Sequence, residues 1–401
     1  MSASAKVLRN PTRVLFILTQ ALNPTSGGVQ MSTVKIGRWL ASRGLEVAVF
    51  SFAAVGHQTQ AFCRLYAAEH PGNSRSERNL AQLSQVLADF RPDVVINQMP
   101  YEHEIGEVLL AQKKYLLLAC LRNTLFSVKN NLDDYANSLL PAFLRPVAHN
   151  FIGRSALLKL HKVRHRRDLR RILQFYDHFI MFGPPNIDEL KYFVGEFEPN
   201  KIRLIPNSIP RVAKTVPEKE KRLLWLGRVA HAQKQAGLIP EVWKRVAEGL
   251  PDWQLDIVGD GPALEEVKEK VRIQGLERVF FHGRQIPDDF FSRASIFFMT
   301  SAFEGFPNTL VEAQSYGTVP VIFDSYPVAR WLIKDGCNGF LIPPFDVEKM
   351  SSKIVEVGRV RQDDLAHQCL ESASEFSIDS VGQQWLKLFS EYRLPSAAEP
   401  E

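Results

Sequence analysis

Two glutamates eight residues apart bracket the stretch EGFPNTLVEA, residues 304–313, in which a loop turns into a helix. Glu304 precedes the expected helix, and Glu312 follows about two turns later. Two such carboxylates could accept hydrogen bonds from sugar hydroxyls, and the amides at the helix start between them could hold an anion. The structural alternative is a capping box over Thr309–Glu312, in which Glu312 bonds the backbone N–H of the cap and Glu304 is a solvated loop residue.

A basic pair follows an apolar run in the second half of the chain. Arg228 and Lys234 lie in LGRVAHAQKQ, directly after RLLWLG. Guanidinium and ammonium groups can hold a diphosphate by charge-assisted hydrogen bonds without a metal ion. The alternative is an ordinary exposed basic pair, which is common on protein surfaces.

Two glycine-containing turns are further candidates. Gly27 and Gly28 in SGGVQ precede an amphipathic stretch, and bare backbone at a helix start can approach a phosphate closely. The segment is not G-x-G-x-x-G, and no acidic residue ends the next apolar run, which disfavours a nicotinamide-binding fold. Gly259 in VGDGP ends another apolar run. Turn geometry alone is the alternative at both places.

These candidates lie between apolar runs that alternate with helical patterns, and the alternation occurs in both halves of the chain. Near-continuous apolar strands separated by helices predict an α/β protein of two Rossmann-like parallel-sheet domains that face each other across a cleft. The expected parts are a first domain at 1–205, a second domain at 206–373, a last helix at 374–393 and a disordered tail at 394–401.

The composition of the 401 residues is that of an ordinary globular protein, 45% hydrophobic and 23% charged. No apolar run approaches the roughly 20 residues that cross a bilayer. Val14–Leu22 is interpreted as a first strand and not as a signal peptide. The four cysteines lack metal or disulfide spacing, which favours a reduced, cytoplasmic protein.

Positive charge is concentrated in one segment. Residues 154–171 carry eight Lys and Arg against one Asp, so the rest of a chain with net charge +5 is slightly acidic. Such a local patch argues against nucleic acid as a partner and for one anionic surface, such as phospholipid headgroups. Leu157, Leu158, Leu160 and Val163 are interleaved with the charges and could form an apolar stripe on a bilayer. The alternative is a solvated basic helix.

The order of these motifs resembles glycosyltransferase family four, the glycosyl transferases group 1, whose fold is called GT-B. The resemblance is carried by LWLGRVAHAQK, LDIVGDGP, VFFHG, EGFPNTLVEAQSYGTVPVI and DGCNGFLIPPFD, over roughly residues 200–390. Over residues 1–200 it rests on SGGVQ, FYDHFIMFG and IPNSI. The pair of glutamates spaced as E-x7-E is the most specific single element.

The resemblance implies roles for the candidate residues. Arg228 and Lys234 would hold the diphosphate of a nucleotide-sugar donor, and Glu304 would contact the transferred sugar. The remaining donor-binding residues would be Gly27, Gly28, Gly259, Glu312 at the ribose, and the amides of Asn308, Thr309 and Leu310 at the distal phosphate. The last helix would cross back onto the first domain. No metal and no cofactor are implied besides the donor, expected to be UDP- or GDP-linked.

The sequence departs from the family pattern in two places. A histidine often follows the strand represented here by YLLLACLRN, but Arg122 and Asn123 stand there instead. Arg228 and Lys234 are six residues apart, where five is common. The acceptor-side candidates are Arg122, Asn123 and His103, the last within NQMPYEHE at residues 97–104.

The expected function is transfer of a sugar, with retention, to a hydroxyl of a glycan or lipid-linked acceptor in lipopolysaccharide, capsule or exopolysaccharide biosynthesis. The expected location is cytoplasmic, with peripheral attachment to the inner face of the membrane through residues 154–171. Two alternatives stay open: a GT-B nucleotide-sugar epimerase, and a non-catalytic binding or scaffold protein with a decayed donor site.

Overall fold

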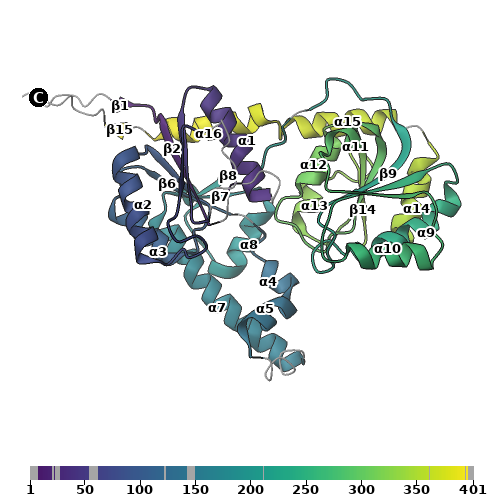
Figure 1. Cartoon of the computed structure of the whole chain (residues 1–401), viewed down its shortest axis with the longest axis horizontal. Helices are drawn as coiled ribbons and strands as arrows, with labels where there is room; N and C mark the ends of the chain where they lie inside the picture. The colour runs from purple at the N-terminus through teal and green to yellow at the C-terminus, as the bar shows by residue number, and fades with distance from the viewer. Residues whose placement is uncertain are drawn as a thin grey trace, which may run out of the picture.

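The computed structural model describes residues 8–19, 22, 28–53, 62–121, 123–141, 150–210, 212–360, 362–392 and 394–395. Within them the chain forms two large parallel sheets flanked by helices, one sheet in each half of the chain (Figure 1). The predicted fold class, two parallel-sheet α/β domains, is therefore confirmed. None of the described helices combines the length and the apolar character needed to cross a membrane.

The first sheet has seven strands, which in chain order are β2 (Arg13–Leu18), β3 (Glu46–Ser51), β4 (Arg64–Ala67), β5 (Val94–Asn97), β6 (Leu116–Cys120), β7 (His178–Met181) and β8 (Ile202–Leu204). Their spatial order is β4-β3-β2-β5-β6-β7-β8. The order reverses between β2 and β5, and ligands of such sheets bind where it reverses, at the carboxyl ends of the strands. The helix that follows β2 therefore begins at the expected ligand site.

The helices of the first domain are α1 (Gly28–Ser42), α2 (Glu77–Phe90), α3 (His103–Ala111), α4 (Ser127–Asn130), α5 (Leu132–Leu139), α7 (Phe151–Phe175) and α8 (Pro185–Val194), and a short 3₁₀ turn, η2 (Pro199–Lys201), precedes β8. Helices α4, α5 and α7 extend away from the sheet as a protrusion (Figure 1). Leu132 and Ala136 of α5 are buried against Leu157 of α7, which joins the helices of the protrusion through a small apolar core of their own.

The second sheet has six strands: β9 (Glu220–Leu226), β10 (Gln254–Val258), β11 (Val279–Gly283), β12 (Ala294–Met299), β13 (Val319–Phe323) and β14 (Phe340–Ile342). Their spatial order is β11-β10-β9-β12-β13-β14, and it reverses between β9 and β12. The loop after β9 carries Arg228 and Lys234, and the loop after β12 carries Glu304. The topology thus brings together two segments that are about 70 residues apart.

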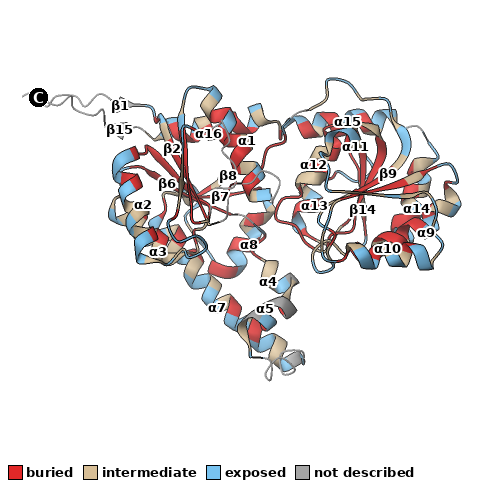
Figure 2. Cartoon of the chain, in the orientation of Figure 1, coloured by how far each residue is buried: buried red, intermediate tan, exposed pale blue. Residues whose placement is uncertain are grey.

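The helices of the second domain are η3 (Ala236–Leu238), α9 (Ile239–Gly249), α10 (Leu264–Ile273), α11 (Asp288–Arg293), α12 (Asn308–Gln314), α13 (Pro327–Leu332), α14 (Val347–Gly358) and α15 (Asp363–Ser374). The strands β12 and β13 are buried along their whole length. Figure 2 shows buried residues in the interior of both domains. Apolar side chains on both faces of such strands account for the near-continuous apolar runs in the sequence.

The last helix, α16 (Ile378–Glu391), packs against α1 of the first domain (Figure 1). The indole Nε1 of Trp39 donates to Asp379 Oδ1 at 2.7 Å, and Trp385 and Phe389 are buried in the first domain's core. An aromatic contact also joins the domains, because Phe182 after β7 lies 5.8 Å from Phe306 before α12, measured between ring centroids. These contacts join the two domains.

The predicted disordered tail differs from the structure at its first residues. Leu394–Pro395 form β15, which pairs antiparallel with β1 (Leu8–Arg9). The remaining residues of the tail lie outside the described part of the chain.

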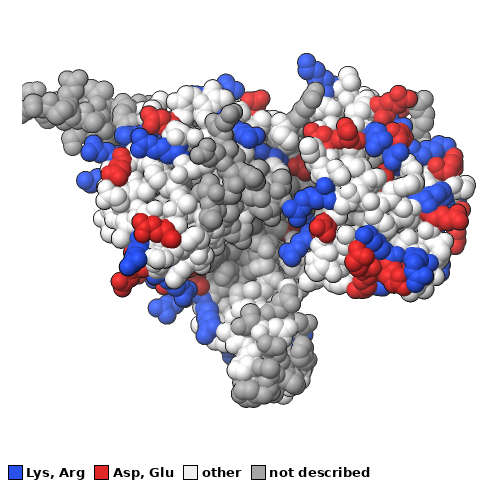
Figure 3. Space-filling view, viewed as in Figure 1, with Lys and Arg blue, Asp and Glu red and all other residues white. Residues whose placement is uncertain are grey.

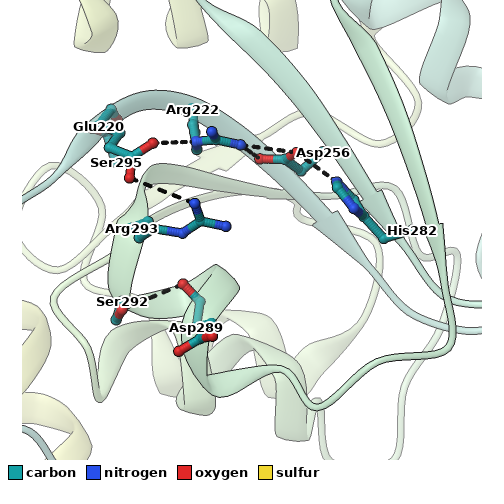
Figure 4. A network of polar contacts seen from close by, with 8 residues as sticks. All are labelled: Glu220, Arg222, Asp256, His282, Asp289, Ser292, Arg293 and Ser295. Atoms are coloured by element: carbon teal, nitrogen blue, oxygen red, sulfur yellow. Dashed lines mark hydrogen bonds and ion pairs between the residues drawn. The ribbon is translucent and has the colours of Figure 1, made fainter.

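A buried carboxylate ties together three strands of the second sheet (Figure 4). Asp256 of β10 is 2% exposed, accepts from Arg222 of β9 at 2.9 Å and lies 2.7 Å from Nε2 of His282 of β11. Arg222 also contacts Glu220. None of these residues lines a pocket at the domain junction, so we assign the network to the stability of the sheet.

Candidate active site

Among the described residues, four pockets lie at or beside the junction of the domains, and three of them include residues predicted from the sequence. Figure 3 shows Lys and Arg side chains on the second domain's side of the groove. The helix pocket lies between α1 and the second domain and is lined by Lys35 and Glu312. The turn pocket lies over the turns after β9 and β10 and includes Gly259. The loop pocket lies between the protrusion and the loop after β9 and includes Lys234. Arg228 lines both the turn and the loop pocket, so its charge is available to a ligand that spans them.

Lys234 and Glu304 form a close ion pair at the loop pocket. Lys234 Nζ lies 2.6 Å from Glu304 Oε1, and Gln233 Nε2 donates to Glu304 Oε2 at 3.0 Å. Both oxygens of the carboxylate therefore have partners, and Glu304 is only 6% exposed. Lys234 and Gln233 line the pocket, and Glu304 lies behind them. The carboxylate thus fixes the position of a cation that faces the pocket.

The backbone around this pair is itself fixed. The hydroxyl of Thr300, at the end of β12, donates to the carbonyl of Lys234 at 2.7 Å and accepts from the indole of Trp225 at 3.1 Å. The amide of Ala302 donates to the carbonyl of Gln233 at 2.7 Å. These bonds link the loop after β9 to the loop after β12, so the basic loop and the acidic loop keep one geometry.

Gly305 brings the first domain against this site. A Cβ atom at residue 305 would lie 2.7 Å from the Cα atom of Asn123, so only glycine allows the two backbones to approach this closely. Asn123, predicted as an acceptor-side residue, lines the loop pocket together with Lys234. Arg122, its neighbour and fellow candidate, lies outside the described residues.

Glu312 is bound by a lysine of the first domain. Lys35 Nζ of α1 lies 2.9 Å from Glu312 Oε1, and both side chains are mostly buried. The capping-box alternative is wrong, because α12 begins at Asn308 and no side chain caps it. Glu312 therefore turns towards the helix pocket and not back towards its own helix start.

The start of α12 faces the start of α1. A Cβ atom at Gly28 would lie 3.3 Å from the side-chain amide of Asn308, so these two candidates adjoin across the junction. Of the three amides expected at the distal phosphate, two already donate to carbonyls: Asn308 to Phe306 at 2.9 Å, and Leu310 to Pro307 at 3.0 Å. Among described residues the amide of Thr309 has no acceptor, so one of the three is free for a ligand. Gly27 lies outside the described residues.

Gly259 has a structural reason to be glycine. Its φ is 141°, and a Cβ atom there would lie 1.8 Å from the carbonyl oxygen of Gly227. The turns after β9 and β10 can pack together only because residue 259 has no Cβ atom, and residues of both turns line the turn pocket.

The structure does not bring His103 to the site. Its Nε2 lies 3.1 Å from Asp168 Oδ1 of α7, and His103 lines none of the three pockets. In the same segment, Asn97 Nδ2 donates to Tyr176, and Gln98 donates to Thr33. Asn97 and Gln98 are therefore buried, hydrogen-bonded residues of the first domain, and neither lines the helix, turn or loop pocket.

Several pocket residues were missed by the sequence interpretation. Lys35 lies two turns after Gly28 on α1, and that spacing could have indicated that it shares the face of Gly28. Gln233 adjoins Lys234, and Arg284 follows β11 and lines both the helix and the turn pocket. A basic residue directly after a parallel strand is the signal that could have identified Arg284.

A buried phenol lies near the ion pair. Tyr326 is 3% exposed, and its hydroxyl has no hydrogen-bond partner among the described residues. Burial raises the pKa of Tyr326 well above its ordinary value, and the nearby Glu304 carboxylate raises this pKa further. The phenol therefore stays protonated near the site.

Two family models match the chain. The glycosyl transferases group 1 model matches residues 220–359, and the Glycosyltransferase Family 4 model matches residues 26–211. A lipopolysaccharide 1,6-galactosyltransferase of Salmonella typhimurium is 35% identical over 148 residues, 35% of this chain and 40% of that protein. The chain thus spans less than half of that relative. The amylovoran biosynthesis glycosyltransferase AmsD of Erwinia amylovora is 22% identical over 92% of this chain and 98% of that protein.

A solved structure is similar over nearly the whole chain. The crystal structure of Anabaena Alr3699/HepE in complex with UDP-glucose superposes with a TM-score of 0.72, covering 95% of this chain and all of that one, at 16% identity. At this identity the likeness establishes the fold. With the two family matches on either side of the domain junction, the chain belongs to the glycosyltransferases of family 4, the glycosyl transferases group 1, and has the GT-B fold.

Proposed function

We propose that this protein moves a sugar from a nucleotide-diphosphate donor, UDP- or GDP-linked, to a hydroxyl of a glycan or lipid-linked acceptor. The reaction retains the anomeric configuration and serves lipopolysaccharide, capsule or exopolysaccharide biosynthesis. The observation that carries the proposal is the position of Arg228 between the turn and loop pockets, beside Lys234. Two cations at this place match a diphosphate with a nucleoside on one side and a sugar on the other.

The chemistry needs no enzyme nucleophile. The acceptor oxygen forms a bond to the anomeric carbon, the bond from that carbon to the diphosphate oxygen breaks, and the acceptor proton passes to the leaving diphosphate. Arg228 and Lys234 stabilise the charge that develops on this leaving group. Glu304 is unsuited to covalent attack because both its oxygens are hydrogen-bonded. Its proposed roles are to position Lys234 and to contact the transferred sugar.

Glu312 and Lys35 are proposed to act at the nucleoside. Glu312 lines the helix pocket next to the turn pocket, where it can accept from ribose hydroxyls. Lys35 holds one carboxylate oxygen at 2.9 Å and so keeps the group oriented towards that pocket. Gly259 and Gly28 are proposed to let the backbone of their turns approach the donor closely, because they carry no side chain.

The experiment that tests this function is a thermal-shift screen of the full chain against UDP, GDP and their sugar conjugates. One nucleotide diphosphate should raise the melting temperature, whereas the nucleoside without phosphates should not, because the cations recognise the diphosphate. A chain that responds to none of these compounds would contradict the proposal.

Two alternatives are less well supported. A scaffold protein with a decayed donor site does not need the pairing of Lys234 with Glu304 or a cation between two pockets. An epimerase needs no acceptor, whereas the loop pocket opens between the donor-side cations and the first domain. An epimerase would release altered sugar without any acceptor.

We also propose that α7 attaches the protein to the inner face of the membrane. Its exposed side includes Lys159, Leu160, Val163, Arg166 and Arg170. Leu160 and Val163 are 40% and 62% exposed and lie among these cations. Basic residues reaching anionic headgroups, with apolar residues between them, match a bilayer surface.

The predicted apolar stripe on α7 needs one correction. Leu157 is buried in the protrusion and Leu158 packs beside it, so neither can reach a bilayer. Ile152, 79% exposed near the start of α7, was not part of the predicted stripe and lies on the exposed side instead.

A further inference from the structure

The side of the loop pocket that belongs to the first domain is built by the segment 123–135, which we call the α4–α5 wall. It contributes Asn123, Ser127, Asn131 and Tyr135, whereas the opposite side carries the two cations of the second domain. The wall lies on the part of the protrusion nearer the second domain (Figure 1). A ligand held by the wall therefore faces the donor side of the pocket across a short gap.

The described side chains of the wall that line the pocket are uncharged. They offer two amides, a hydroxyl and a phenol, and the apolar surface of Val128. Lys129, the one Lys or Arg in the sequence of this segment, lies over the rings of Phe126 and Tyr192, at 4.9 Å and 5.7 Å from the ring centroids, and does not line the pocket. Such a surface can hydrogen-bond hydroxyl groups but offers no cation to a phosphate or a carboxylate.

The wall is also firmly supported. The ring of Tyr135 packs edge-on against His161 of α7, with centroids 5.3 Å apart, and burial lowers the pKa of His161, so the support is uncharged near neutral pH. Leu132 and Ala136, on the same helix as Tyr135, are buried against α7. A rigid aromatic edge with hydroxyl-binding groups beside it is suited to a sugar ring, which has apolar C–H faces and a rim of hydroxyls.

We propose that the α4–α5 wall is the acceptor-binding surface and that it takes an uncharged sugar residue. The proposal rests on the transferase function above and adds to it the site and the chemical class of the acceptor group. It differs from the acceptor contacts expected at residues 97–104, none of which lines the loop pocket. The wall is carried by α7, so an acceptor sugar at the wall and a lipid bound by the exposed side of α7 can belong to one molecule.

The test measures binding of neutral p-nitrophenyl hexopyranosides, α and β, by saturation-transfer NMR on the full chain with UDP or GDP present. Glycerol 1-phosphate serves as the anionic comparison. In the variant Ser127→Trp the indole should fill the pocket, because Ser127 lines it. The fold should tolerate the change, since Ser127 is partly exposed and its hydroxyl makes no hydrogen bond to described residues. Ser155→Trp, at an exposed position of α7 outside the pocket, is the matched control.

The wild type should bind at least one neutral hexoside and not glycerol 1-phosphate. Ser127→Trp should weaken that hexoside at least about tenfold, while Ser155→Trp leaves it unchanged and all three proteins keep their nucleotide affinity. Asn131→Ala, a smaller change, should weaken the hexoside as well. The proposal that the α4–α5 wall binds the acceptor would be overturned if the protein bound nucleotide but no hexoside. It would also be overturned if neither Ser127→Trp nor Asn131→Ala weakened hexoside binding. A wild-type protein that binds neither UDP nor GDP would instead overturn the proposed function.

Discussion

Glu304 is not the solvated loop carboxylate of the structural alternative, because it is buried and holds Lys234 at the pocket. Glu304→Ala should lower turnover at least about tenfold, equivalent to roughly 1.4 kcal/mol of transition-state stabilisation. The fold should persist, since Lys234 faces an open pocket and can be solvated. Steady-state kinetics with Glu248→Ala, an exposed glutamate on α9, as control measures the effect. Equal kcat/KM for wild type and Glu304→Ala would remove Glu304 from the site.

The two cations give a second prediction at this scale. Arg228→Ala and Lys234→Ala should each weaken UDP or GDP binding about tenfold or more, because each removes a charge next to the diphosphate. Calorimetric titration measures this, with Arg245→Ala on the surface of α9 as the control. EDTA should leave activity unchanged. Activity that is lost with EDTA and regained with Mg²⁺ would contradict a purely cationic diphosphate site.

The sequence allowed prediction of pocket residues that follow strands of one sheet, such as Lys234 and Glu304. It did not allow prediction of a residue such as Lys35, which contacts the other domain. Lys234 and Glu304 stand after consecutive neighbours in the sheet, so strand order alone brings them together. Lys35 contacts Glu312 across 277 residues, and no local signal indicates which lysine of α1 does so. His103 was misplaced because a histidine at a helix start could equally face α7, as it does.

At the scale of elements, the approach of Gly305 to the chain at Asn123 sets how the domains meet. Gly305→Ala should reduce transfer strongly but leave nucleotide binding nearly intact, because the added Cβ would press on the first domain's backbone and not on the second domain's cations. Gly106→Ala is the matched control, since its Cβ would have only the Tyr176 hydroxyl at 3.7 Å nearby. Transfer kinetics and nucleotide titration of both variants test this prediction. Full transfer activity of Gly305→Ala would show that the close approach of residue 305 to Asn123 is not needed.

The long apolar strands and the helices after them were predictable from periodicity, because burial on both faces imposes it. The structural alternative for the start of α12 was a capping box, but Glu312 bonds Lys35 instead, and a tertiary ion pair prevails over a local cap. Helices α4 and α5 were not predicted. They span only Ser127–Asn130 and Leu132–Leu139, too short for a clear helical period, and their stability comes from packing on α7.

At the scale of the whole molecule, the protrusion carries a basic exposed surface on α7 and one side of the loop pocket on α4 and α5. Arg166→Glu with Arg170→Glu should abolish co-sedimentation with vesicles of phosphatidylglycerol and phosphatidylcholine, because each basic residue contributes about 1 kcal/mol near an anionic surface. Lys268→Glu with Arg272→Glu on α10 is the control of equal charge change.

Binding of the wild type should weaken as salt rises and should be absent with phosphatidylcholine alone. Equal sedimentation with neutral vesicles, or none with anionic vesicles at low salt, would leave α7 as a solvated basic helix.

The central claim is that the groove transfers a sugar to an acceptor. The most direct measurement is mass spectrometry of the full chain incubated with the nucleotide sugar selected by thermal shift, with and without a bacterial glycolipid extract. We predict nucleotide diphosphate release that depends on the extract, together with an acceptor whose mass has increased by one sugar residue. Release of free nucleotide and altered sugar without the extract, or no consumption of the donor with it, would contradict the claim.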